Sequence, residues 1–103
     1  MPQRNQATDL EEIIHRIQDH TGVTGLIVVN RDGVAVRTTM DMATTNQHCA
    51  VLSRLSDQAR SAVRDLDPNN DVTFLRLRSK KNEILLAPDK DFTLVVIQDP
   101  RKE

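Results

Sequence analysis

Gly25-Leu26-Ile27-Val28-Val29 decides the fold, because five consecutive apolar residues without alternation are typical of a strand that is covered on both faces. Leu94-Val95-Val96-Ile97, near the carboxyl end of the chain, has the same character. Two such strands in one small domain predict the middle of a single sheet. The more polar strands are then expected on either side of them.

The remaining strands follow from turn signals. Asn30-Arg31-Asp32-Gly33 contains an Asp-Gly pair, a favourable hairpin signal, and leads into a returning strand at Val34–Thr39. Three further strands are predicted at Val72–Arg78, Glu83–Ala87 and Phe92–Gln98. The polar connections between these three are short, which favours an antiparallel meander.

Two helices are predicted from capping and periodicity. The first begins at Thr8, which with Glu11 has the spacing of a capping box, and ends before Gly22. The second begins at Thr44, by the same spacing to Gln47, and ends at Pro68 because proline disfavours helical geometry in the preceding residue. The apolar stripe of the first helix recurs at i, i+3, i+4 and i+7: Leu10, Ile13, Ile14 and Ile17.

The predicted fold class is α+β, with element order α-β-β-α-β-β-β. We expect a five-stranded antiparallel sheet with one helix on each face. Residues 1–7 are predicted to be a disordered segment, residues 8–100 a single domain and residues 101–103 a carboxyl-terminal tail.

Composition limits the possible functions. The 103 residues include 14 basic and 15 acidic side chains and only 2% aromatic residues, whereas nucleic-acid binding favours a basic surplus and aromatic stacking platforms. The single cysteine, Cys49, is consistent with a reducing compartment. No apolar run approaches the roughly 20 residues that cross a bilayer. We therefore expect an intracellular protein that binds neither nucleic acid nor membrane.

Candidate catalytic groups are sparse. His48 and Cys49 are neighbours on a predicted helix, where successive side chains do not face each other, so they do not form a nucleophile–base pair. His15 and His20 are spaced poorly for one metal ion, and no four-ligand zinc pattern or phosphate-binding glycine loop is present. We expect no enzyme activity, cofactor, metal site or small-molecule substrate.

A long stretch carries a family resemblance. Residues 63–84, VRDLDPNNDVTFLRLRSKKNEI, together with Gly22–Asn30 and Ala87–Phe92, resemble the roadblock class of dynein light chains, and the resemblance extends from about residue 9 to residue 100. It implies a non-catalytic, cytoplasmic and microtubule-associated light chain of the dynein motor that binds the intermediate chain and contributes to cargo attachment or regulation. Wider relatives of the same fold regulate small GTPases, which supplies the alternative function.

Two surfaces suggest self-association. The strand at Val34–Thr39, if it lies at a sheet edge, exposes unpaired backbone groups that a second copy would pair. One face of the long helix is wide enough to contact both its own sheet and a copy of itself, and the resemblance likewise implies a homodimer or a mixed dimer with a paralogue. The expected product is a ten-stranded sheet. The predicted interface residues are Val34, Ala35, Val36, Arg37 and Thr38 on the strand and Leu52, Leu55, Ala59 and Ala62 on the helix.

The first helix is predicted to leave part of its sheet face uncovered. Five strands about 4.8 Å apart need roughly 19 Å of cover, whereas a helix is only about 10 Å wide. We expect an amphipathic helix of the intermediate chain to fill this gap. The basic residues at 76, 78, 80 and 81 are expected to form a solvated strand and turn, although two of them could contact acidic partner residues. The predicted partner contacts are Ile13, Ile17, Phe74 and Arg76.

Overall fold

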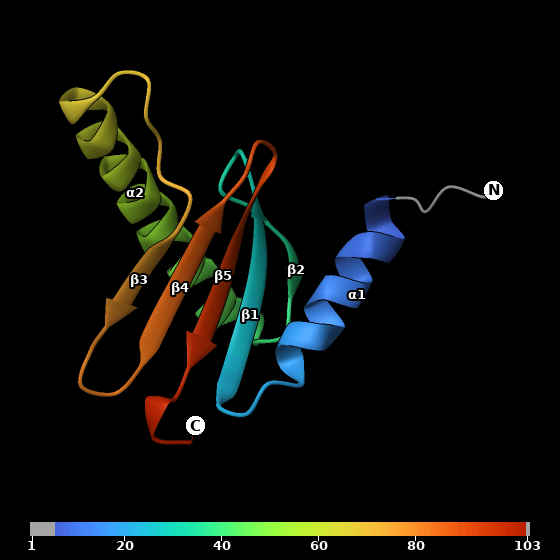
Figure 1. Ribbon diagram of the computed structural model, residues 1–103. Coiled ribbons are helices and arrows are strands. Elements are labelled where there is room, and N and C mark those ends of the chain that lie inside the picture. The colour runs from blue at the N-terminus through green and yellow to red at the C-terminus, as the bar shows by residue number, and fades with distance from the viewer. Residues whose placement is uncertain (1–5, 103) are drawn as a thin grey trace.

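The computed structural model describes residues 6–102 and contains two helices and one sheet (Figure 1). The predicted element order and the α+β fold class are confirmed. The carboxyl-terminal residues 101 and 102, predicted to be a tail, continue a short 3-10 turn. The elements are α1 (Gln6–Gln18), β1 (Val23–Asn30), β2 (Ala35–Thr38), α2 (Met42–Leu66), β3 (Leu75–Arg78), β4 (Glu83–Pro88), β5 (Phe92–Gln98) and η1 (Pro100–Lys102).

The sheet has the strand order β2-β1-β5-β4-β3, with every neighbouring pair antiparallel. The two most apolar strands, β1 and β5, pair with each other from Val23 to Asn30 in register with Gln98 to Phe92. They therefore lie at the centre of the sheet, as their uninterrupted hydrophobic runs predict. The edges are β2 and β3, the two shortest strands.

Each face of the sheet carries its own apolar core under one helix, which confirms the predicted layers (Figure 1). Alternate residues of the central strands supply the two cores, because successive side chains of a strand point to opposite faces. On the face of α2 the buried residues are Ile27, Val29, Cys49, Leu52, Leu86, Val95 and Ile97. On the face of α1 they are Ile14, Leu26, Val28 and Val96.

The edge strands are shorter than their apolar patterns predict. The segment Val72–Phe74 lies outside β3, which begins at Leu75 opposite Leu86. The ladder stops near the proline that ends β4, Pro88, which has no N–H to donate to a neighbouring strand. On the other side, β2 covers only Ala35–Thr38, and the register shifts between Val28 and Val29 on β1.

Both helices begin before their predicted first residues. The structure extends α1 back to Gln6, so the predicted start at Thr8 is wrong and the predicted disordered segment 1–7 is helical at its last two positions. Residues 1–5 of that segment lie outside the described part of the chain. In α2 the cap is Asp41, three residues before the predicted Thr44, and its carboxylate accepts a 2.8 Å hydrogen bond from the Thr44 amide.

The end of α2 agrees with the prediction. The helix stops at Leu66, and Asp67 adopts an extended conformation immediately before Pro68. Its 25 residues span about 37 Å, whereas the sheet is roughly 19 Å wide, so the helix is longer than the surface it crosses. Figure 1 shows its carboxyl-terminal end extending beyond the sheet on the side of β3, and Leu66 is 88% exposed there.

Candidate functional site

The α1 face of the sheet contains an apolar groove of about 290 Å³. Its floor is formed by β4, β5 and the start of β1, because α1 lies over β1 and leaves the surface toward β3 uncovered. The end of α1 forms one wall and the segment that enters β3 forms the other. The lining residues are Ile17, His20, Val23, Phe74, Leu85, Ala87, Leu94, Val96 and Gln98.

The groove is bordered by charge on the side of β3. Arg76 lies opposite Leu85 on the adjacent strand and Arg78 lies opposite Glu83, so both arginines share the face of the groove. The carboxylate of Glu83 is only 1% exposed and forms an ion pair with the guanidinium of Arg76. A buried carboxylate is costly unless it is paired, so this contact holds the arginine at the rim.

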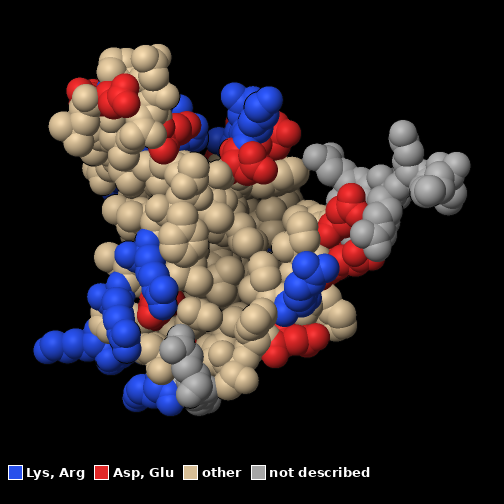
Figure 2. Space-filling model, viewed as in Figure 1, with Lys and Arg blue, Asp and Glu red and all other residues tan. Residues whose placement is uncertain are grey.

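Figure 2 shows the same face as a continuous surface of neutral residues with charged side chains at its margins. Basic side chains gather over the β3–β4 corner, whereas acidic and basic side chains are mixed at the opposite end of these strands and along α1. The groove therefore joins an apolar floor to one basic margin.

The structure brings together two of the four predicted partner contacts. Ile17 and Phe74 line the groove from opposite walls. Arg76 stands at the rim, and Ile13 is 44% exposed on α1 outside the lining. The sequence analysis missed the floor residues of β4 and β5. Their apolar character was evident, but which of them remain uncovered depends on where α1 packs, and a strand pattern does not contain that information.

The predicted interface residues fall on two separate surfaces. Ala35 to Thr38 form the β2 edge, where Val36 and the preceding Val34 are exposed. Ala59 and Ala62 lie in the carboxyl-terminal half of α2. Leu52 is buried in the core of the single chain and Leu55 packs against that core.

The two sheet edges differ in how open they are. At β2, Arg37 makes a 2.9 Å ion pair with Glu11 of α1, and the strand is paired irregularly with β1. At β3, Leu75 packs against the α2-face core while Leu77 is 45% exposed. The β2 edge is thus tied to both helices, through Glu11 of α1 and through a 2.7 Å hydrogen bond between the Thr38 and Thr45 hydroxyls, whereas β3 exposes Leu77.

The loop between α2 and β3 is held by an ion network. The Asp71 carboxylate accepts two hydrogen bonds from Arg60, at 3.1 and 3.0 Å, and one from Arg64 at 3.0 Å. These hydrogen bonds hold the pKa of Asp71 well below its usual range, and those from the Arg60 guanidinium lower it most. The network fixes the loop against the last turns of α2 and so places the start of β3.

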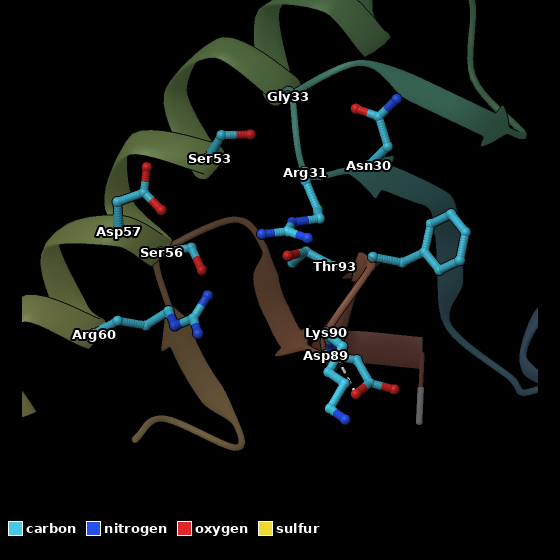
Figure 3. A pocket seen from close by; sticks show the side chains of 11 residues that line it. Asn30, Arg31, Gly33, Ser53, Ser56, Asp57, Arg60, Asp89, Lys90 and Thr93 are labelled. Carbon is cyan, nitrogen blue, oxygen red and sulfur yellow. Dashed lines mark hydrogen bonds between the residues drawn. The ribbon is translucent and has the colours of Figure 1, made fainter. Parts of the chain in front are cut away.

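A second cavity, of about 190 Å³, lies between α2 and the turns at one end of the sheet. Figure 3 shows Arg31 from the β1–β2 turn and Arg60 from α2 pointing into it, with the Ser56 hydroxyl between the helix and the sheet. Asp57, Asp89 and Lys90 add charges of both signs to its lining. Its lining contains no histidine or cysteine.

The two residues considered for catalysis have structural roles. Cys49 is buried in the α2-face core, and burial raises the pKa of its thiol, which disfavours the reactive thiolate. The Nδ1 atom of His48 lies 2.8 Å from the Thr44 carbonyl oxygen, within the same helix. Residues 6–102 contain no group of three metal-ligating side chains, and no helix among them is long and apolar enough to cross a bilayer.

The described residues thus combine an open apolar groove on one face of a five-stranded antiparallel sheet with two short edge strands. The chain belongs to the Roadblock/LC7 domain family, whose model matches residues 9–99.

Solved structures share this fold. A Roadblock/LC7 domain from Streptomyces avermitilis matches with a TM-score of 0.79 and 16% identity, over 87% of this chain and 77% of that chain. Myxococcus xanthus MglB matches with a TM-score of 0.66 and 14% identity, over 79% and 68%. The gliding protein MglB of Thermus thermophilus matches with a TM-score of 0.77 and 9% identity, over 98% and 79%. At identities this low, the structural matches show a common fold alone.

Proposed function

We propose that this chain is a non-catalytic, self-associating adaptor whose α1-face groove binds an amphipathic helix of a larger protein, the intermediate chain of cytoplasmic dynein. The observation that carries the proposal is the apolar groove between Ile17 and Phe74, which the chain leaves uncovered. In a helix-in-groove complex the guest buries its apolar face in such a surface. This proposal places the protein in the cytoplasm, on microtubules.

The assignment to dynein rests on sequence. The resemblance in residues 63–84 includes the loop that precedes β3, the strand itself and the β3–β4 turn. These segments form one wall of the groove and its basic margin. The proposal therefore links the part of the chain that most resembles the dynein light chains to the surface that is open to a partner.

We further propose that the second copy pairs at the β3 edge rather than at the predicted β2 edge. Leu77 is 45% exposed on β3 and the small residues Ala59 and Ala62 lie toward the end of α2, so a two-fold axis that pairs the β3 strands could also bring the two helices together. Strand pairing there would still give the expected ten-stranded sheet. Two grooves on one dimer then raise the effective concentration for a partner that carries two helices.

The second candidate function is a regulator or scaffold for a small GTPase. The bacterial structures that match, MglB among them, favour this candidate, because the wider relatives of the fold include such regulators. One MglB structure has a tetrameric arrangement, which is consistent with self-association as a property of the fold. A GTPase presents a folded surface, whereas the proposed dynein partner presents one helix.

The test is a binding assay with purified partners. We expect the helical segment of the dynein intermediate chain to bind the wild-type chain, and Ile17→Asp or Phe74→Ala to weaken binding at least about tenfold by removing groove contacts. Met42→Asp is the matched control, because Met42 is 61% exposed at the start of α2 on the other face. Binding of a nucleotide-loaded GTPase instead of the segment would select the second candidate.

The edge assignment has its own pair of variants. Val36 on β2 and Leu77 on β3 are almost equally exposed, at 43% and 45%. We expect Leu77→Asp to shift the solution mass from dimer to monomer and Val36→Asp to leave the dimer intact. The opposite result would restore the β2 edge, and a monomeric wild-type chain would contradict self-association.

A further inference from the structure

We infer that the groove selects an acidic helix, and that Arg76, oriented by Glu83, is the residue that reads its charge. This inference rests on the proposed function of the groove and adds the chemistry of its occupant. Four basic residues belong to the β3–β4 hairpin at the groove margin: Arg76, Arg78, Lys80 and Lys81.

The position of these charges follows from strand register. Phe74, which lines the groove, and Arg76 are two residues apart, and the partner of Arg76 on β4 is Leu85, which lies on the groove floor. The guanidinium therefore stands beside the apolar surface on the same face of the sheet. Its side chain is 58% exposed, so it remains accessible to a docked partner while it contacts Glu83.

Glu83 explains why an arginine occupies this position. The carboxylate is buried at the start of β4 and pairs with Arg76. A buried carboxylate fixes the orientation of its partner more firmly than solvent does, and a planar guanidinium carries N–H groups on more than one edge, so it can contact two carboxylates at once. Glu83 is therefore a positioning residue, and Arg76 is the residue that contacts the partner.

The charge is uneven along the groove. The turn between β3 and β4, residues 79–82, carries Lys80 and Lys81 next to the two arginines. The turn between β4 and β5, at the other end of the same strands, carries Asp89 and Asp91 on either side of Lys90. Figure 2 shows the same contrast between the basic corner and the mixed end. A helix with carboxylates at the β3–β4 end fits this distribution.

The size of the floor limits the contact. Leu94 and Gln98 both line the groove and are four residues apart on β5, a distance of about 13 Å. That length accommodates between two and three helical turns. The inferred occupant is thus an amphipathic helix with a short apolar stripe and carboxylates along the side that faces β3.

The test uses two synthetic helical peptides with identical apolar stripes, one flanked by glutamates and one by lysines. We expect the full-length chain to bind the acidic peptide at least about tenfold more tightly at low ionic strength, and this preference to shrink as salt screens the exposed charges. Equal binding of both peptides would overturn the charge inference and leave the helix groove standing. Binding of neither would contradict the proposed groove itself.

Variants locate the effect. Arg76→Gln should abolish the preference, reversal of the neighbouring charges in Arg78→Glu/Lys80→Glu/Lys81→Glu should weaken it, and Lys90→Glu at the other end should preserve it. Glu83→Gln should reduce the acidic-to-basic affinity ratio while the chain stays folded, and a purely structural role would leave that ratio unchanged. Recruitment of the chain to anionic lipid vesicles by the same corner, without preference for the acidic peptide, would also overturn the inference.

Discussion

The two faces of the sheet bear helices of unequal length, and this difference separates the closed core from the open groove. The 25-residue α2 crosses the sheet, and its core draws residues from every strand. The 13-residue α1 lies over β1 and leaves β4 and β5 open. Adjacent residues of β4 show the contrast, because Leu86 is 2% exposed under α2 while Leu85 lines the groove. The sheet face that α1 leaves partly uncovered is available to a partner.

The largest expected effect compares those two leucines. Leu86→Ala should lower the free energy of unfolding by about 3 kcal/mol, since it leaves a cavity in a closed core. Leu85→Ala should cost only about 1 kcal/mol, because its side chain already borders the open groove. Urea denaturation of the two variants measures the difference. Equal losses would mean that the α1 face is as closed as the α2 face.

The next effect concerns the two rim arginines. Arg76→Ala removes the ion-pair partner of the buried Glu83 carboxylate and should lower stability by about 1.5 kcal/mol, a value reduced from that of a fully buried pair because the guanidinium is 58% exposed. Arg78→Ala, on the same strand, should cost less than about 0.5 kcal/mol. Thermal denaturation at neutral pH compares them. An Arg78→Ala variant as unstable as Arg76→Ala would contradict the positioning role of Glu83.

A smaller effect arises at the start of α2, on the closed side. The backbone amide of Thr44 donates a hydrogen bond to the Asp41 carboxylate and lowers its pKa. The ionised cap therefore stabilises the fold at pH values above the ordinary pKa of aspartate. This stabilisation is lost as the pH falls through the lowered pKa of the folded state. Asp41→Ala should lower Tm by about 3 °C at neutral pH. The difference from wild type should shrink below about pH 4.

Asp41→Asn provides the control for this titration, because asparagine caps a helix but does not titrate. Its Tm should fall less steeply with acid than that of the wild type. A constant gap between wild type and Asp41→Ala over this pH range would show that ionisation of the cap contributes nothing.

The smallest effect is expected at the loop that enters β3. Hydrogen bonds from Arg60 lower the pKa of Asp71, so its stabilisation is present at neutral pH and is lost only in strong acid, well below its usual titration range. Asp71→Asn should reduce Tm slightly at pH 7, since these pairs are exposed. Relative to the wild type, amide hydrogen exchange in this variant should become faster in residues 70–74 and stay the same elsewhere. Unchanged exchange there would mean that the ion network does not hold the loop.

Sequence predicted the fold well because its strongest signals are local. Uninterrupted apolar runs identified β1 and β5 as central strands, and Pro68 marked the end of α2. The helix starts were missed because Thr44 satisfies the capping-box spacing although Asp41 provides the cap. The length of β3 was predicted incorrectly because it depends on pairing with β4, and β4 ends at Pro88, which has no N–H to donate.

The candidate site was predicted only in part, because it depends on packing between distant elements. Ile17 and Phe74 were identified from the width of the sheet and the helical stripe. The floor of the groove, formed by Leu85, Leu94 and their neighbours, depends on which strands α1 leaves uncovered. The predicted interface combined β2 with Leu52, Leu55, Ala59 and Ala62 of α2, and only the three-dimensional path of that helix shows that Leu52 and Leu55 serve the core of the single chain.

The most direct test of the unfinished face is an NMR titration of the full-length chain with the helical segment of the dynein intermediate chain. We predict that amide shifts will change along the groove, at Val23, Leu85 and Leu94, while those of Cys49 and Leu52 on the buried side of α2 stay constant. Shift changes confined to the α2 side, or none at saturating segment, would contradict the assignment of the α1 face as the docking surface.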